Sequence, residues 1–218
     1  SLYLSARNGV FCLDTKTQQF HKLNVEPAYY ECFDIDPEGY IYLCKWNSLI
    51  LARLDQTEKE AIHVVLSQES HNTYITRVRA TDRGAYISTL GAGLFFYETK
   101  TGEISHYTTE NEIGLPSNFC YNIAVLRNGN VLITTDKGIS CYFPGESRFT
   151  TIDLMENFPS TYIINGCGLF VSENNQIFVG DTKGVTTFSE DEFRKANTVR
   201  QMPELYFSKL WVNNQVIV

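Results

Sequence analysis

Residues 75–107, ITRVRATDRGAYISTLGAGLFFYETKTGEISHY, contain four short runs of apolar, β-branched and aromatic residues. Three turn-forming sequences separate these runs: Asp82-Arg83-Gly84, Gly91-Ala92-Gly93 and Lys100-Thr101-Gly102. Short runs of this composition, bounded by Gly and Asp, are typical of strands joined by hairpins, and no window keeps an apolar face at helical spacing. The stretch therefore predicts an antiparallel sheet of four strands.

The same unit recurs along the chain. The turn residue of each unit is marked, at steps of 45, 45 and 46 residues, by Gly39, Gly84, Gly129 and Asn175. A second marker follows the same period through Gly9, Asn47, Gly93, Gly138 and Gly184. Asn47 replaces a glycine, and we expect it to take the left-handed backbone conformation that Asn tolerates. A four-stranded repeat of about 40–45 residues is the signature of a propeller blade, so we predict an all-β fold, a partial β-propeller.

The repeat divides the chain into one incomplete blade and four full four-stranded blades, which together form a propeller fragment over residues 1–202. The incomplete blade lacks its first strand; the predicted blades are residues 1–23, 29–66, 74–107, 115–152 and 159–197. The fourth strand of the last blade, around Phe193, is weak, and a short helix is the alternative there. Residues 203–218 leave the period and carry two strand-like runs around Asn213-Asn214, which predicts the truncated start of another domain.

Composition and charge narrow the classes of partner. The 218 residues include 18 Lys and Arg against 25 Asp and Glu, a net charge of −7 with no basic run, so we expect no nucleic-acid partner. No apolar run approaches the roughly 20 residues of a membrane helix, so we expect no direct membrane insertion. The chain opens at Ser1 in a strand-like run, without a signal peptide, and we therefore expect it to be a fragment of a longer protein.

The cysteines do not form a recognisable metal or redox motif. They stand at positions 12, 32, 44, 120, 141 and 167, without CxxC pairs and without a histidine at zinc-ligand spacing. Cys12 and Cys141 occupy a repeat position that Phe96 fills in another unit, which favours small buried side chains. We predict that Cys12 and Cys141 are reduced and buried on separate blades, although the spacing leaves disulfides open.

Two further features of the sequence bear on metal binding and catalysis. Residues 34–41, DIDPEGYI, match the first half of a calcium loop, but Lys45 stands where such a loop needs a bidentate Glu, so a β-turn is the preferred interpretation. The four histidines are scattered, and no H-E-x-x-H or G-x-S-x-G motif occurs. We expect no catalytic residue, metal or cofactor in this chain, and an active site assembled from several blades stays as the alternative.

Polar and aromatic residues gather in the loops before the first strands and after the second strands of the units. In a propeller these loops share one face around the central channel. Saccharides are bound by aromatic faces and planar hydrogen-bonding groups, so this face is the predicted binding site. For the Tyr and Trp residues, packing between blades is the alternative role. The candidate residues are Tyr29, Tyr30, Lys45, Trp46, His71, Asn72, Tyr74, Asn118, Tyr121, Asp136, Tyr162 and Asp181.

The units resemble the two-component regulator propeller repeat, Reg_prop. The resemblance rests on the lead-in Leu115-Pro116-Ser117-Asn118, the turn Asn128-Gly129, the strand that ends in Thr134-Thr135, and Gly138-Ile139. The tail, with Pro203, Leu210 and Val212-Asn213-Asn214, resembles the start of the Ig-like Y_Y_Y domain that follows such propellers. The tryptophan that is common in the second strand of the family repeat is absent from these units.

This resemblance implies the periplasmic sensor of a bacterial hybrid two-component regulator. Such a sensor would bind a carbohydrate-like ligand and relay the signal through the Ig-like domain and a membrane helix to a histidine kinase. A protein-interaction scaffold and a propeller lyase or hydrolase are the alternatives, because fold alone does not choose between them. Family propellers commonly have seven blades. We therefore expect the fragment to need the rest of its propeller or to self-associate through a face with Leu2, Leu4, Val10 and Phe11.

Overall fold

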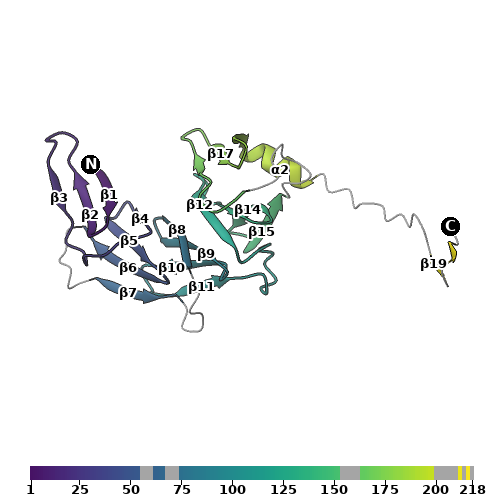
Figure 1. Ribbon diagram of the computed structural model, residues 1–218, viewed down its shortest axis with the longest axis horizontal. Helices are drawn as coiled ribbons and strands as arrows, with labels where there is room; N and C mark the ends of the chain where they lie inside the picture. The colour runs from purple at the N-terminus through teal and green to yellow at the C-terminus, as the bar shows by residue number, and fades with distance from the viewer. Residues whose placement is uncertain (55–60, 67–73, 153–162, 199–210, 213–214, 217–218) are drawn as a thin grey trace.

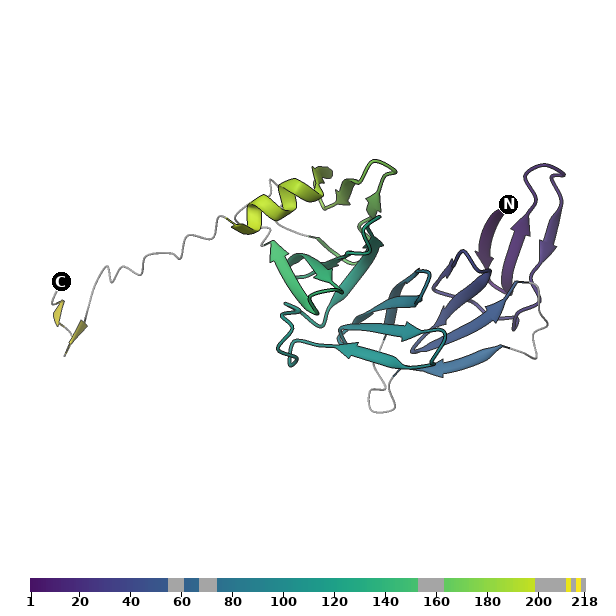
Figure 2. The same cartoon turned by 180° about the vertical axis from the view of Figure 1, so that it is seen from behind.

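The computed structural model describes residues 1–54, 61–66, 74–152, 163–198, 211–212 and 215–216. These residues form antiparallel sheets in which strands that are consecutive in sequence are neighbours. The successive sheets follow one another along an arc (Figures 1 and 2). The predicted all-β fold, a partial β-propeller, is confirmed.

The strands of each sheet have the following bounds. The first sheet contains β1 (Leu2–Ala6), β2 (Gly9–Leu13) and β3 (Phe20–Lys22). The second contains β4 (Cys32–Ile35), β5 (Tyr40–Lys45), β6 (Ser48–Arg53) and β7 (Ile62–Val65). The third contains β8 (Tyr74–Ala80), β9 (Gly84–Leu90), β10 (Leu94–Glu98) and β11 (Ile104–Tyr107).

The remaining sheets complete the described chain. The fourth sheet contains β12 (Cys120–Val125), β13 (Val131–Thr135), β14 (Gly138–Phe143) and β15 (Arg148–Ile152). The fifth contains β16 (Leu169–Val171), β17 (Gln176–Gly180) and β18 (Val185–Ser189), followed by helix α2 (Glu190–Thr198). A separate antiparallel pair is formed by β19 (Trp211–Val212) and β20 (Gln215–Val216).

The hydrophobic core lies between neighbouring sheets. Strands β9, β13 and β14 are buried along nearly their whole length, because both faces of a sheet in this arrangement meet a neighbour. Each core cluster draws residues from two successive sheets: Val10 packs with Ile41, Leu51 with Ile87, Leu94 with Ile133, and Leu132 with Ile177. The burial of apolar side chains between neighbouring sheets is therefore the main favourable contribution to the stability of this fold.

One repeat position holds glycine for two different physical reasons. Gly39 and Gly129 have φ values of +86° and +83°, and Asn175 has φ +58°, so these residues take the left-handed turn conformation. Gly84 does not have this conformation. A Cβ atom on Gly84 would lie 1.9 Å from the carbonyl oxygen of Tyr97, so this position excludes a side chain because β9 and β10 approach closely.

The hairpin between β5 and β6 corrects the prediction for Asn47. Lys45 pairs with Ser48, which leaves a two-residue turn, and the left-handed residue in it is Trp46, with φ +54°. The left-handed residue is therefore Trp46, one position before Asn47, where the repeat alignment predicted it. Strand pairing sets this one-residue offset, and the spacing of glycines did not reveal it.

The last predicted blade, residues 159–197, has the short helix that was the alternative to a fourth strand around Phe193. The structure has a helix at Phe193, so three of the described sheets, and not four, have four strands. Ser189 and Glu192 form a reciprocal capping box: the Glu192 carboxylate accepts from the Ser189 N–H at 2.7 Å, and Ser189 Oγ accepts from the Glu192 N–H at 3.3 Å. Phe193 is 1% exposed and packs near Phe188, so the helix contributes to the core cluster that the fourth and fifth sheets share.

The exposure of four residues of the first sheet and the burial of two cysteines were predicted from the sequence. Leu2 and Leu4 are exposed as predicted, and Phe11 is half-buried, but Val10 is wholly buried against the second sheet. Cys12 and Cys141 are buried free thiols on the first and fourth sheets, as predicted.

Candidate functional site

The predicted loop face exists as one end of the sheets. In an up-and-down sheet, the start of the first strand and the end of the second strand lie at the same end. Tyr29 precedes β4, Trp46 follows β5, and Tyr74 begins β8, so the topology places all three side chains at this end of the second and third sheets. Their exposed fractions are 60%, 68% and 42%, which is unusual for large aromatic residues. We call Tyr29, Glu31, Trp46 and Tyr74 the loop-face cluster.

Hydrogen bonds hold the Trp46 turn against both neighbouring segments. The Trp46 N–H donates to Glu31 Oε2 at 3.2 Å. The Trp46 carbonyl accepts from the Ile75 N–H at 3.0 Å, next to Tyr74 at the start of β8. The turn of the second sheet is thus fixed to the third sheet through its backbone, which leaves the indole ring free to face solvent.

The pKa of Tyr74 is shifted by its surroundings in the loop-face cluster. Burial raises the pKa of Tyr74, and the charge of Glu31 and then the hydroxyl of Tyr29 raise it further. The phenol therefore stays protonated at neutral pH and can donate a hydrogen bond. The cluster combines three exposed aromatic rings with one carboxylate acceptor, which is a suitable set for the apolar and hydroxyl faces of a sugar.

The backbone of Trp46 is strained. A bulky residue with positive φ is a true outlier, and the left-handed conformation costs an L-residue about 1–2 kcal/mol. Because the side chain is mostly exposed, burial of the indole ring does not offset this cost. Strain of this kind gathers at functional sites, where the position of a side chain matters more than the stability of the fold.

Several predicted site residues have structural roles. Tyr30 is 1% exposed and donates its hydroxyl to the Glu26 carbonyl at 2.7 Å, so it is a core residue, in agreement with the packing alternative and not with ligand contact. Lys45 forms an ion pair with Glu26 at 3.4 Å. Asn118 Oδ1 accepts from the Thr109 N–H at 2.9 Å, and the Asn118 carbonyl accepts from the N–H groups that flank the Gly91–Gly93 turn. Asn118 therefore holds loops together.

The other predicted residues lie further along the same end of the sheets or outside the description. Tyr121 is half-buried, and burial followed by the charge of Asp136 raises its pKa, so these two residues are neighbours at the fourth sheet. Asp181 Oδ1 caps a turn by accepting from the Gly184 N–H at 2.8 Å. Three predicted residues lie outside the described residues: His71, Asn72 and Tyr162.

Sequence reasoning missed two residues of this face. Glu31 accepts the Trp46 N–H and neighbours Tyr74, and Phe119 is 49% exposed at the loop before β12. Both follow predicted residues directly, Tyr30 and Asn118. The signal that could have found them is therefore their position in the same loops.

The calcium-like segment 34–41 is a β-turn. Asp36 Oδ1 accepts from the N–H groups of Glu38 and Tyr40, both at 2.9 Å, and Asp36 Oδ2 accepts from the Tyr42 hydroxyl at 3.0 Å. Asp34 instead accepts from the Ala80 N–H at 2.9 Å and so joins the second sheet to the third. Within the described residues, His, Cys, Asp and Glu side chains do not gather in groups of three or more that could hold a metal ion. Nor does the described part of the chain contain a helix long and apolar enough to cross a membrane.

Comparison with known proteins gives similarities of structure alone. No protein-family model matches the chain, and no curated protein sequence matches it. The extracellular domain of the hybrid two-component system BT4673 from B. thetaiotaomicron superposes with a TM-score of 0.66 at 18% identity, over 85% of this chain and 25% of that chain. The corresponding domain of BT3049 gives a TM-score of 0.59 at 19% identity, over 75% of this chain and 24% of that one.

A WD40 propeller is similar as well. The propeller domain of Doa1 has a TM-score of 0.58 at 14% identity, over 88% of this chain and 64% of that chain. The present chain spans about a quarter of the length of the two-component structures. At these identities the similarity concerns the fold, and the fold that these structures share with the chain is the β-propeller.

Proposed function

We propose that this chain is part of an extracytoplasmic, periplasmic sensor domain of a hybrid two-component regulator, and that its loop face binds a carbohydrate-like ligand. The observation that carries the proposal is the loop-face cluster, in which Tyr29, Trp46 and Tyr74 are exposed together beside Glu31. The similarity in fold to extracellular domains of hybrid two-component systems supports this choice over other propeller functions.

The relay is part of the same proposal. Ligand binding at the second and third sheets would be passed through an Ig-like domain and a membrane helix to a histidine kinase. The proposal requires the full-length gene to encode these three elements in that order, on the C-terminal side of the propeller. A gene with a different architecture would remove the signalling part of the proposal and leave the binding part to be judged on its own.

The binding part is tested on an array of neutral and acidic oligosaccharides. We expect wild-type protein to bind at least one saccharide, and Trp46→Ala and Tyr74→Ala to lose that binding. Glu31→Gln should weaken it, because the variant removes the charge and keeps the shape of the side chain. The matched control is Phe20→Ala, since Phe20 is 62% exposed but belongs to the first sheet. Equal binding by the loop-face variants and the control would refute the proposed site.

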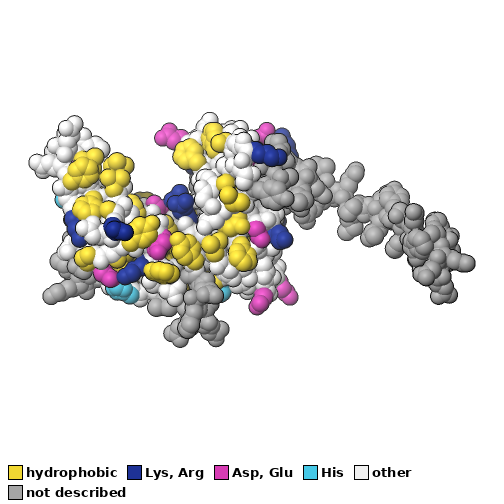
Figure 3. All heavy atoms as spheres, viewed as in Figure 1, with side chains coloured by type: hydrophobic (Ala, Val, Ile, Leu, Met, Phe, Trp, Pro, Cys, Tyr) yellow, Lys and Arg dark blue, Asp and Glu magenta, His cyan; other side chains and the backbone are white. Residues whose placement is uncertain are grey.

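A second candidate function is protein–protein interaction, including association with a second copy or with further propeller blades. The observation that favours it is the exposed apolar surface of the first sheet, where Leu2, Leu4 and Phe20 are 50%, 41% and 62% exposed (Figure 3). Sedimentation velocity of wild-type protein and of Leu2→Ser/Leu4→Ser tests this candidate. A concentration-dependent dimer that the double variant abolishes supports association with a second copy through this surface, and a monomer at all concentrations refutes association with a second copy.

A further inference from the structure

A cavity lies at the opposite end of the sheets from the loop face. It encloses about 410 Å³ between the third and fourth sheets, within the range of about 300–1,000 Å³ that is usual for small-molecule sites. The turn after β8, the turn after β12 and the turn after β14 form its rim. These connections leave the first and third strands of their sheets, so the topology separates them from the loop-face cluster. We call this cavity the inter-sheet groove.

Aromatic side chains form part of the lining of the groove, beside polar and charged residues. Tyr86, Phe96 and Phe143 line it and are each at most 8% exposed. Tyr86 packs on Phe96 with ring centroids 4.5 Å apart, and the Tyr142 and Tyr107 hydroxyls meet at 3.3 Å behind them. The first contact lies within the third sheet, and the second joins the third sheet to the fourth.

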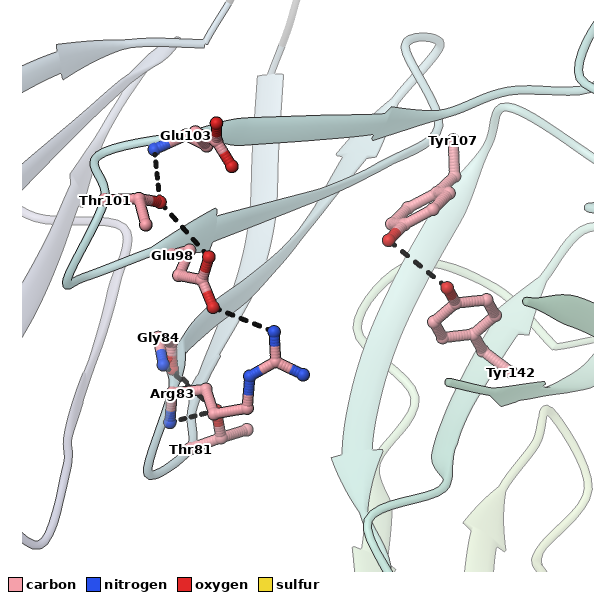
Figure 4. A network of polar contacts seen from close by, with 8 residues as sticks. All are labelled: Thr81, Arg83, Gly84, Glu98, Thr101, Glu103, Tyr107 and Tyr142. Atoms are coloured by element: carbon pink, nitrogen blue, oxygen red, sulfur yellow. Dashed lines mark hydrogen bonds and ion pairs between the residues drawn. The ribbon is translucent and has the colours of Figure 1, made fainter. Parts of the chain in front are cut away.

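Arg83 is held in place at the rim. Its Nη2 donates to Glu98 Oε1 at 2.8 Å (Figure 4). Its guanidinium carbon lies 5.9 Å from the centre of the Phe96 ring. Thr101 Oγ1 donates to the other carboxylate oxygen of Glu98 at 3.1 Å, which fixes the carboxylate in turn. Only one of the guanidinium nitrogens is used by Glu98, and the side chain remains 68% exposed. The other nitrogens are therefore available as oriented donors.

Tyr86 supplies the second polar group. The residue is 7% exposed and lines the groove, and its hydroxyl makes no hydrogen bond to any residue of the described ranges. Burial, and then the charge of Tyr107, raise the pKa of this hydroxyl to about 12, while the charge of Arg83 acts in the opposite direction, so the hydroxyl is protonated at neutral pH. Tyr86 and Arg83 lie against the same ring, with the Tyr86 centroid 4.5 Å and the guanidinium carbon 5.9 Å from the centre of Phe96. The ring of Tyr86 is buried, but its hydroxyl is not among the buried unpartnered polar atoms, so it reaches the solvent in the groove and can donate to a ligand there.

The charges around the groove point to a neutral ligand. Asp82 and Glu146 line it together with Arg83, and Glu146 is paired with Arg148. An anion would meet two carboxylates, and a cation would meet the guanidinium. A hydroxyl group both donates and accepts, so a polyhydroxylated molecule can satisfy Arg83, Tyr86 and Asp82 at once, with its C–H faces on the aromatic wall. We propose that the inter-sheet groove is a second binding site, for a neutral saccharide of one or two rings, held by Arg83, Tyr86 and Asp82.

The test uses the whole chain and a fixed panel of probes: glucose, galactose, N-acetylglucosamine, maltose, cellobiose and xylobiose. Ligand-observed NMR titration gives a dissociation constant for each probe. We expect at least one to bind, Tyr86→Phe to weaken it about three- to tenfold by loss of a hydrogen bond, and Arg83→Gln to weaken it by at least about tenfold, since its hydrogen bonds are charge-assisted. Arg7→Gln, an exposed arginine of the first hairpin, is the control that should change nothing.

The outcomes separate this site from the loop face. Trp46→Gly is titrated in parallel with the same probes. If Trp46→Gly abolishes all binding and Tyr86→Phe changes none of it, the groove proposal is overturned and the loop-face proposal stands; the reverse result supports the groove alone. A panel without any binder overturns the groove proposal. Tyr86→Phe should also leave the melting temperature unchanged, and a clear fall would show that the hydroxyl is bonded within the fold, which contradicts the proposal.

Discussion

Trp46 gives a test in which stability and ligand binding are expected to move in opposite directions. Its left-handed backbone costs about 1–2 kcal/mol for an L-residue, whereas glycine adopts this conformation freely and loses about 0.5–1 kcal/mol of chain entropy. The indole ring is 68% exposed, so its removal sacrifices little burial. The difference predicts that Trp46→Gly stabilises the fold by about 0.5–1 kcal/mol, or about 1–4 °C in melting temperature for a chain of this size.

Two further variants separate the ring from the backbone. Trp46→Asn removes the ring and tolerates the left-handed turn, so it should behave as Trp46→Gly does. Trp46→Phe keeps an aromatic ring and keeps the strain, so its stability should match wild type and its saccharide binding should largely survive. Urea and thermal unfolding of the four proteins measure the first quantity, and the saccharide array measures the second.

Either half of the reasoning can fail on its own. A fall in the melting temperature of Trp46→Gly by several degrees would show that the indole is packed in the fold, and the strain argument would be wrong. Binding retained in Trp46→Gly and Trp46→Asn would show that the ring does not contact the ligand.

Three other predictions follow from the fold. Gly84→Ala should destabilise the fold by about 2–3 kcal/mol, because the new Cβ would meet a backbone carbonyl. Gly129→Ala has open space around the Cβ and should destabilise by only about 1–2 kcal/mol, the cost of the left-handed conformation. Urea unfolding measures both losses, and equal losses would contradict this prediction. Hydrogen bonds from Ser189 lower the pKa of Glu192. The stability that this cap adds is therefore present above the pKa of the unfolded chain and is lost as pH falls through the pKa of the folded protein. Glu192→Gln should weaken the dependence of stability on pH in the acid range, and an unchanged dependence would contradict the role of the cap. Burial raises the pKa of Cys120 to about 12, so a thiol reagent should modify it only after unfolding, and rapid reaction in the native protein would show that the fourth sheet opens.

The repeat made the sheets predictable because each strand is bounded by residues with a local reason to turn. The helix at Phe193 shows the limit of this approach. Its capping box, Ser189 to Glu192, is visible in the sequence, but the 45-residue period favoured a strand there, and the local signal prevails in the structure.

The site was predictable in part. Membership of the loop face follows from strand order, and the topology brings Tyr29, Trp46 and Tyr74 together as expected. Whether Tyr29 or Tyr30 faces solvent depends on the direction of each side chain, and a loop has no regular alternation of side chains from which to predict it. The structure shows that Tyr30 is in the core. The inter-sheet groove was not predictable, because its turns, at Asp82-Arg83 and Asn128-Gly129, meet only when the sheets pack.

The sharing of every core cluster between two successive sheets has a consequence for how the molecule can change. Among the described residues, each hydrophobic core cluster is completed by two successive sheets. The stability of a sheet therefore depends on its immediate neighbours and hardly at all on the other sheets. Stability in such an array is close to a sum of unit terms and nearest-neighbour terms, as in a one-dimensional chain of coupled elements. A destabilising substitution should therefore affect the sheet that carries it and the adjacent sheets, and have little effect on sheets further away. One blade can then change in sequence during evolution while the other blades keep their geometry.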